Sequence, residues 1–261
     1  MDMNKQVILL STHLLNQFVI TQYNRLQETI ADDFDLFLLI EYDDSLVIPD
    51  SIKYYPFDVD TLNNLHYDPI EETIVPGSNH FQVFQFYKDY PQYDYYWNIE
   101  YDVYFNGEWK TLFDAYKFID SDFISSHLER FHQTPNWTWW KSLQLKTIDI
   151  PEYQYVKSFN PIYRISSKAM AVIDKTLLEG NSGHHEVLIP TVLNYLGYKI
   201  NDWGGIGEFV LSGFENSFYY TDSSVNNLFY MGSSMRFRPV FNLKEIENMI
   251  SDNLLYHPIK C

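Results

Sequence analysis

The sequence predicts an α/β fold of a Rossmann-like kind, with a mostly parallel central sheet and helices on both faces. Three observations predict it. Short β-branched apolar runs alternate with segments of helical periodicity. The segment 93–105 is apolar on both faces, as a central parallel strand is. The 261 residues are 46% hydrophobic, which is enough for one large domain over residues 1–261.

The first 60 residues read as a βαβ unit. The run KQVILLSTH at 5–13 predicts a buried strand, and residues 14–31 predict a helix. Apolar side chains recur at helical spacing in that helix: Phe18, Val19, Tyr23, Leu26 and Ile30. Strands are expected at 34–44 and 52–58. Such an opening favours a parallel sheet covered by helices.

The middle of the chain continues the alternation. After a Pro-Gly turn, the segment 75–91 predicts a helix that ends by Pro91. The apolar strand 93–105 follows, and then an amphipathic helix over 109–116. Residues 122–128 predict another strand.

The second half is less regular. The Trp- and Pro-rich stretch 131–160 is a candidate active-site loop. Helices are expected at 166–180, with a serine cap and a terminal glycine, and at 184–197. A Gly-rich bend at 203–207 and a helix near 242–254 complete the prediction.

Composition limits the partners. The net charge of −17 disfavours a nucleic-acid or anionic-membrane surface, which needs clustered Lys and Arg. The sequence contains no run of about 18 apolar residues, so we expect no transmembrane segment. The N-terminus lacks secretory features. We expect a cytoplasmic protein, with peripheral docking on a membrane and the oligomeric state left open. The 22 Tyr, 19 Phe and 6 Trp suit core packing or, alternatively, sugar stacking or aromatic partner contacts.

Two carboxylates end the central strand in YYWNIEYDVYF. In an extended segment Glu100 and Asp102 project to one side, with Tyr101 facing away. At the carboxyl end of a central parallel strand they lie where open α/β sheets bind ligands. Two such acids favour Mg²⁺ or Mn²⁺ between them, which would neutralise a leaving diphosphate. The alternative is a pair of strand-end acids that face water.

A similar acidic stretch, IEYDD, ends the second predicted strand. We favour Glu100 and Asp102 for the metal, because they follow the more central strand. An acid at the end of the second strand often contacts a ribose hydroxyl in nucleotide-binding sheets. Asp43 and Asp44 are therefore candidate nucleotide contacts.

The block WNIEYDVYFNGEW resembles a family of uncharacterised proteins whose hallmark is a Trp, a Glu-Tyr-Asp-Val core and a Gly-x-Trp. That family resembles nucleotide-diphospho-sugar glycosyltransferases of the GT-A fold. The resemblance covers about residues 75–200 and the tail, with weaker likeness in FNPIYRISSKAM and LLYHPIK. It implies a GT-A-like domain with a nucleotide-binding half, 1–120, and an acceptor-binding half with the tail, 121–261.

The resemblance also implies roles for single residues. Asp102 would be the direct metal ligand, and Glu100 a ligand or a ribose contact. His257 would be a further metal ligand, with Lys260 on the diphosphate. The alternative for His257 is a tail histidine that packs on a neighbour. At the end of the first strand, three side chains would lie beside the base: Ser11, Thr12 and His13.

In inverting GT-A enzymes a carboxylate at the start of an acceptor-side helix deprotonates the acceptor hydroxyl. The resemblance places Glu186, in GNSGHHEVLIP, in that role. The alternative is a first-turn acid that the helix dipole favours. His185 is a candidate substrate contact.

Cationic side chains are scarce. Arg236 and Arg238 would face one way on a strand and hold a diphosphate or an acidic acceptor, and Arg164 is a further candidate. For each arginine the alternative is a pairing with one of the 35 acids.

These features predict a metal-dependent enzyme that transfers a sugar from a UDP- or GDP-linked donor to a glycan or other hydroxyl acceptor. Inversion with Glu186 as base is favoured, and nothing in the sequence decides against retention. A non-catalytic carbohydrate- or partner-binding protein is one alternative, and its acids would be salt-bridged. A metal-dependent phosphohydrolase is another, and it needs further converging acids and histidines.

Overall fold

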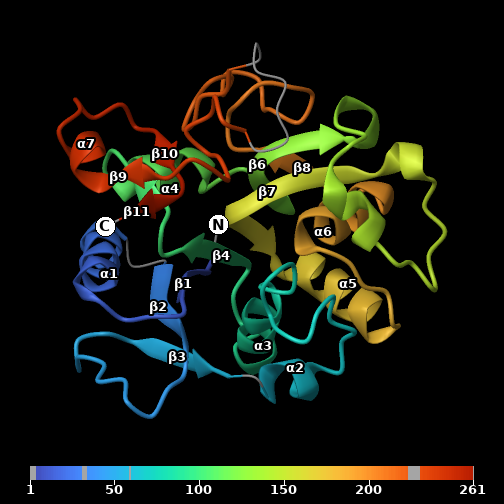
Figure 1. The fold of residues 1–261 in the computed structure, drawn as a ribbon, viewed down its shortest axis with the longest axis horizontal. Helices are drawn as coiled ribbons and strands as arrows, with labels where there is room; N and C mark the ends of the chain where they lie inside the picture. Colours follow the sequence, from blue (N-terminus) through green and yellow to red (C-terminus); the bar gives the residue numbers. More distant parts are fainter. Residues whose placement is uncertain (1–3, 31–33, 59, 223–229, 261) are drawn as a thin grey trace.

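A seven-stranded sheet runs through the middle of the protein (Figure 1). The computed structural model describes residues 4–30, 34–58, 60–222 and 230–260. From one edge to the other, the strands are β3 (Tyr54–Phe57), β2 (Phe34–Glu41), β1 (Gln6–Thr12), β4 (Tyr95–Glu100), β7 (Val156–Ser166), β6 (Phe123–Arg130) and β8 (Ile200–Asp202). Strands from both halves of the chain therefore share one sheet.

The sheet is mostly parallel, as the sequence predicts. β1 is parallel to both β2 and β4, β2 to β3, and β6 to β8. The exception is β7, which is antiparallel to β4 and β6 and separates them. The sequence interpretation missed this strand, since it assigned residues 131–160 to an irregular loop and no strand to 161–166.

Helices cover both faces of the sheet, which confirms the predicted α/β class. They are α1 (Gln17–Thr29), α2 (Asp60–Leu65), α3 (Phe81–Asp89), α4 (Trp109–Tyr116), α5 (Ser167–Leu178), α6 (His185–Tyr195) and α7 (Leu243–Glu247). Along β1, Val7 and Leu9 face the core built with α3, α5 and α6. Ile8 and Leu10 face the core built with α1 and α4. This alternation follows from the two-residue period of a strand.

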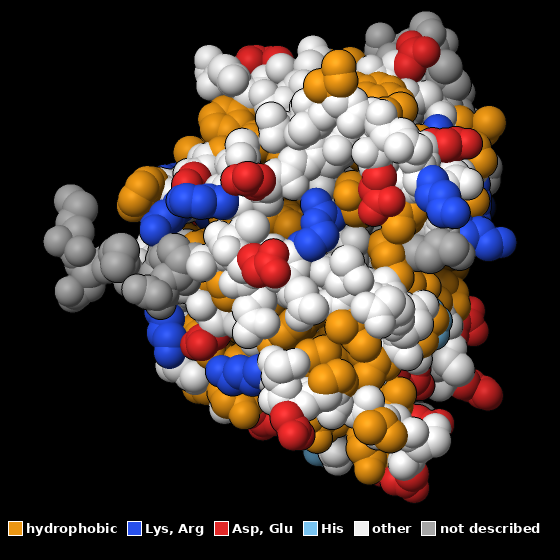
Figure 2. All heavy atoms as spheres, turned by 90° about the vertical axis from the view of Figure 1, so that its left-hand side faces the viewer, with side chains coloured by type: hydrophobic (Ala, Val, Ile, Leu, Met, Phe, Trp, Pro, Cys, Tyr) orange, Lys and Arg blue, Asp and Glu red, His pale blue; other side chains and the backbone are white. Residues whose placement is uncertain are grey.

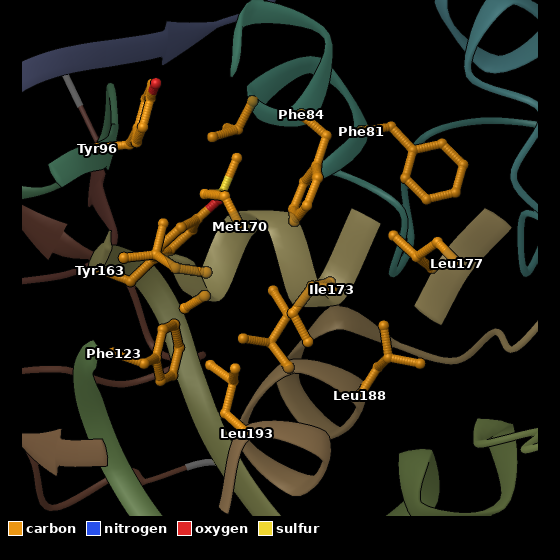
Figure 3. Packing of buried hydrophobic residues seen from close by; sticks show 14 of the residues in the cluster. Phe81, Phe84, Tyr96, Phe123, Tyr163, Met170, Ile173, Leu177, Leu188 and Leu193 are labelled. Carbon is orange, nitrogen blue, oxygen red and sulfur yellow. The ribbon is translucent and has the colours of Figure 1, made fainter. Parts of the chain in front are cut away.

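Figure 3 shows the first of these cores from close by. Phe84 of α3 meets Met170 and Ile173 of α5 near Tyr163 of β7, and Phe81 lies farther along the same layer. All five side chains are almost fully buried. Burying a large apolar side chain contributes about 1.5–3 kcal/mol, so this layer holds β7 firmly in the middle of the sheet.

Local signals set the helix starts. The Asn16 side chain accepts a hydrogen bond from the backbone N–H of Val19 at 3.0 Å, and the Ser166 hydroxyl accepts one from Ala169 at 3.2 Å. Such N-caps satisfy backbone donors that the helix leaves free. The predicted helix near 242–254 is shorter, since α7 ends at Glu247.

The C-terminal segment folds back over the carboxyl end of β4. β10 (Leu255–Tyr256) pairs with β5 (Tyr104–Phe105), and β11 (Ile259–Lys260) pairs with β9 (Phe241–Asn242). The backbone N–H of Ile259 donates to the carbonyl of Asp102 at 2.9 Å. Residues more than 150 positions apart are thereby brought together at one sheet edge.

Charges are mixed on the face seen in Figure 2, which is the left-hand side of Figure 1. There Lys and Arg side chains are interspersed with Asp and Glu. Among the described residues, every helix is too short or too polar to span a bilayer.

Candidate metal centre and active site

The two predicted acids lie at the carboxyl ends of the parallel strands. Glu100 is the last residue of β4 and is paired in register with Ser11 of β1. The chain goes from β1 to β2 on one side, while β4 lies on the other side. Between two such strands the loops diverge and leave a crevice, which is the usual ligand site of an open α/β sheet.

A turn, and not a continuing strand, brings the acids together. Residues 101 and 102 form a turn in which the Val103 N–H donates to the Glu100 carbonyl at 3.0 Å. The Tyr101 N–H donates to the Ser11 carbonyl at 2.9 Å, which fixes the turn to β1. The predicted convergence of Glu100 and Asp102 is present, although the expected extended geometry is not.

His257 joins the two acids. Its Nε2 lies 3.6 Å from Asp102 Oδ1 and 3.9 Å from Glu100 Oε2. Its Nδ1 lies 2.8 Å from the carbonyl oxygen of Arg236, which can only accept, so Nδ1 carries the proton. Burial lowers the pKa of the imidazole. A neutral ring with a free Nε2 lone pair is the form in which histidine binds metals.

The acid–histidine cluster, Glu100, Asp102 and His257, has the dimensions of a cation site. One ligand atom from each residue lies within 4.8 Å of the others. Ligands of Mg²⁺ lie about 2.1 Å from the ion, so binding requires only small side-chain movements. Carboxylates suit Mg²⁺ or Mn²⁺, and the imidazole favours the transition metal Mn²⁺.

The charge of this cluster is not neutralised by a basic side chain. Among the described residues, no Lys or Arg nitrogen lies within 4.0 Å of either carboxylate. Burial raises the pKa of Glu100 above its usual range, and the charges of Asp102 and Glu186 add to this rise. The Asn79 side-chain amide opposes it by donating to Glu100 at 3.3 Å. A bound cation would favour the ionised form.

Two cavities meet at this cluster. The strand-end cavity has a volume of about 600 Å³ and lies over the ends of β1, β2 and β4. The aromatic cavity, of about 470 Å³, lies over β7 and the start of α6. Both are lined by Glu100, Asp102, Asn79 and Arg238. Volumes of about 300–1,000 Å³ are typical of small-molecule sites.

The strand-end cavity contains part of the predicted nucleotide site. Its lining includes the three residues expected beside the base: Ser11, Thr12 and His13. Glu41, the last residue of β2, also lines it. Asp43 and Asp44 do not line it, because β2 ends before them and both are exposed in the following turn. The acid available for a ribose at the end of β2 is therefore Glu41, which the sequence interpretation passed over.

Glu186 lies in the first turn of α6 and lines the aromatic cavity. Its Oε1 accepts a hydrogen bond from the backbone N–H of Asn160 at 3.1 Å. Burial raises the pKa of Glu186 to about 7, against the Asn160 N–H and the charge of Lys157, which lower it. A carboxylate with such a pKa is suited to accept a proton near neutral pH.

The Glu186 carboxylate is held by residues of β7 to which the sequence analysis gave no role. The β6–β7 pairing is irregular between Ile124 and Ser126, which frees the Asn160 N–H for Glu186. Pro190 has no N–H for the Glu186 carbonyl one turn earlier. The Ser158 hydroxyl lies 3.4 Å from that carbonyl, and it donates over a shorter distance, 2.7 Å, to Asn160 Oδ1.

Two adjacent histidines border the same cavity. His184 and His185 both line it, and their rings stack at 5.0 Å between centroids. Burial lowers the pKa of both imidazoles, so they are neutral. Gly77 packs tightly on this pair, since a Cβ there would lie 2.8 Å from the His184 ring. His185, which the sequence analysis named as a candidate substrate contact, therefore lines the aromatic cavity.

The cationic residues proposed for substrate binding lie in different places. Arg238 is exposed and borders both cavities. Arg236 instead donates to the carbonyls of Pro239 at 2.7 Å and Met231 at 3.2 Å, so the two arginines do not share a direction. Lys260 is exposed on β11 and lines neither cavity.

The position of Arg164 contradicts its predicted role as a diphosphate or acceptor contact. It is fully buried in β7 and donates to the carbonyls of Tyr116, Ile119 and Ser121 at 2.5–3.2 Å. Its guanidinium therefore fastens the end of α4 to the sheet and does not face either cavity.

Rings from distant segments line the aromatic cavity: Trp137, Trp139, Phe159, Tyr230 and Phe237. The first three come from the stretch 131–160, which the sequence marked as a candidate active-site loop. Tyr230 and Phe237 had no signal in the sequence beyond their aromatic character.

Comparisons with known proteins place the chain near several solved structures. No protein-family model and no curated protein matches it. It is similar to a protein assigned as a glucose-1-phosphate thymidylyltransferase from Bacillus anthracis, at 11% identity and a TM-score of 0.44 over 77% of this chain and 87% of that one. A 4-diphosphocytidyl-2C-methyl-D-erythritol synthase from Anaerococcus prevotii matches at 10% identity and a TM-score of 0.44, over 76% and 86%. A mycobacterial protein matches at 11% identity and a TM-score of 0.45, over 76% and 64%.

Proposed function

We propose that the protein is a metal-dependent glycosyltransferase that moves a sugar from a UDP- or GDP-linked donor to a hydroxyl acceptor. The observation that supports this most directly is the position of the acid–histidine cluster. Glu100, Asp102 and His257 converge where the two cavities meet. A nucleotide sugar whose nucleoside lies in the strand-end cavity would place its phosphates at the cluster and its donor sugar in the aromatic cavity.

The cluster would hold Mn²⁺ or Mg²⁺, which supplies positive charge to a leaving diphosphate. Arg238 would contact the same phosphates from the cavity rim. In the strand-end cavity, Ser11, Thr12 and His13 would contact the base, and Glu41 a ribose hydroxyl.

Glu186 would act as the base. Its carboxylate would take the proton from the acceptor hydroxyl, while the acceptor oxygen bonds to the anomeric carbon of the donor sugar. The bond from that carbon to the diphosphate oxygen breaks, and its electron pair leaves with the nucleoside diphosphate. The hydrogen bond from Asn160 holds Glu186 in place during the transfer.

Resemblance to the family with the Glu-Tyr-Asp-Val core agrees with this proposal, since it assigns the metal to the same acids. The two alternatives make different demands on the site. A binding protein with salt-bridged acids would need a Lys or Arg partner for Glu100 or Asp102, and the described residues offer none within 4.0 Å; the basic group that does lie there is the His257 ring, whose pKa burial lowers. A phosphohydrolase would need further acids or histidines, and within the described ranges the metal-sized group consists of three residues.

Thermal-shift measurements with UDP, GDP and their sugar conjugates test the proposal, with and without MnCl₂. We expect a stabilisation that requires both nucleotide and Mn²⁺ and that Asp102→Asn abolishes. Asp114→Asn is the control, because Asp114 is exposed on α4 and pairs with Lys110. Stabilisation by free glycans alone would indicate a binding protein. Phosphate release without an acceptor sugar would indicate a hydrolase.

A further inference from the structure

The aromatic cavity has a composition that restricts the acceptor. Indole, phenol and phenyl rings form much of its wall, and carboxylate, amide and imidazole groups converge on it. We infer that the acceptor bound there is an uncharged saccharide, whose ring packs on Trp139 and whose attacking hydroxyl faces Glu186. This inference rests on the proposed function.

Trp139 is presented as a stacking surface. It lies in the short 3₁₀ turn Thr138–Ser142 and is only partly buried. His184 stacks on it with 4.6 Å between centroids and 29° between planes, which fixes the indole against the start of α6. The faces of aromatic rings carry partial negative charge, and the C–H bonds of a sugar ring carry partial positive charge. A flat sugar face is therefore attracted to the indole, with Glu186 two residues along the chain from His184.

The charges of the cavity disfavour an anionic acceptor. Its lining includes three carboxylates, Glu100, Asp102 and Glu186, and one arginine, Arg238. The nearby Lys157 is occupied, since its Nζ lies 2.6 Å from the Glu129 carboxylate. With a donor diphosphate and one divalent cation at the cluster, the balance stays negative, because three carboxylates and the diphosphate outweigh the cation and one arginine. Like charges at these separations repel, so a uronate, sulfate or phosphate on the acceptor would be repelled.

The polar groups disfavour an apolar alcohol or a simple phenol. Asn79, Thr138, His185 and Glu186 line the cavity together with its rings. An acceptor with a single hydroxyl would bury several of these groups without partners, which costs about 1–3 kcal/mol for each. A saccharide offers several hydroxyls that donate and accept, and so can satisfy them.

A glycan array tests the inference with the full-length protein. The array carries uncharged, uronic, sialylated and sulfated glycans, and alkyl and phenyl alcohols are tested in a parallel titration. Each is run with MnCl₂ and UDP or GDP, and again without them. We expect binding to uncharged glycans, and Trp139→Ala to weaken it about tenfold, as the loss of a stacking contact does. Trp139→Tyr keeps an aromatic face and should bind within about threefold of the parent. Tyr153→Ala, which removes an exposed ring outside the cavity, should have no effect.

The inference would be overturned by any of four results: binding only to acidic glycans, binding only to simple alcohols, no binding to any compound, or glycan binding by Trp139→Ala equal to that of the parent. Failure of the proposed function has a different signature. In that case uncharged glycans would bind equally with and without Mn²⁺ and nucleotide, and Asp102→Asn would have no effect on any nucleotide-dependent stabilisation.

Discussion

The imidazole of His257 faces the carboxylate of Asp102 with 3.6 Å between Nε2 and Oδ1, while its Nδ1 donates to the Arg236 carbonyl at 2.8 Å. The backbone near Arg236 thus decides which ring nitrogen is free. A histidine held in this way would bind a metal with its orientation and tautomer already set.

The first prediction concerns metal affinity. His257→Gln should lower the affinity for Mn²⁺ at least tenfold, about the effect seen when metal-site residues are altered. Isothermal titration calorimetry of the nucleotide-free protein measures it. His132→Gln is the control, because His132 is exposed in the short 3₁₀ helix Phe131–Gln133, outside both cavities. Unchanged Mn²⁺ affinity in His257→Gln, with the fold intact by circular dichroism, would remove His257 from the cluster.

The second prediction separates activity from stability at Glu186. Glu186→Gln should lose about 10²–10⁴-fold in kcat, because the base is removed. In the parent, transfer should decline as pH falls through about 7, where Glu186 becomes protonated. Rate measurements from pH 5 to 9 test both points, and a parent profile without an acidic limb would contradict the role.

The same variant should be more stable than the parent at alkaline pH. Burial raises the pKa of Glu186 from 4.5 to about 7 on folding, so the folded protein retains a proton that the unfolded chain has released. The parent therefore loses stability as pH rises from about 4.5 to 7, by up to about 3 kcal/mol. Glutamine carries no such penalty. In urea unfolding, the free energy of unfolding of Glu186→Gln should exceed that of the parent at pH 8 and equal it near pH 4.5. A difference in this free energy that is the same at both pH values would refute the raised pKa of Glu186.

The third prediction uses two neighbouring arginines as a matched pair. Arg238→Ala should weaken UDP or GDP binding in the presence of Mn²⁺ about tenfold, since a hydrogen bond to a charged group contributes about 1.5–3 kcal/mol. Arg236→Ala should instead reduce stability by about 1–2 kcal/mol, because two carbonyl contacts and the ring of Phe241, 3.6 Å away, are lost. Equal losses of nucleotide affinity in both variants would count against a direct contact by Arg238.

The fourth prediction tests the structural role of Arg164. Arg164→Met removes the guanidinium donor from three carbonyls; that of Tyr116 still accepts from the Ile119 N–H at 3.1 Å, while those of Ile119 and Ser121 lose their donor at a cost of about 1–3 kcal/mol each. A loss of about 3 kcal/mol or more in urea unfolding is expected, with nucleotide affinity unchanged in the folded fraction. If Arg164→Met were as stable as the parent but no longer bound nucleotide, Arg164 would have to be assigned to the binding site.

Much of the fold was available from local pattern. The run at 5–13, the helical spacing from Phe18 to Ile30 and the acids after the central strand all matched elements of the structure, because burial on a strand or helix leaves a short-range period in the sequence. The serine cap predicted for the helix 166–180 is Ser166, and it is predictable from local pattern because its hydroxyl acts only three residues away.

β7 escaped local analysis. Its eleven residues, VKSFNPIYRIS, include polar and charged side chains together with a proline, yet all are buried. Distant groups satisfy several of these side chains: Arg164 donates to carbonyls near α4, and Asn160 makes hydrogen bonds with His185 and Glu186. None of these partners lies within twenty residues, so no local pattern reports them.

The sequence by itself determined the parallel α/β core and the carboxylates that end its central strand, because both depend on the period and the termini of single elements. Only the tertiary structure decided which further groups join those carboxylates. His257 arrives through the pairing of β10 with β5, Arg238 is separated from Arg236 by backbone contacts, and Glu186 is held by a strand inserted against the parallel direction. Such placements depend on contacts between residues far apart in the chain, whose physical cause is shared burial and not proximity in sequence.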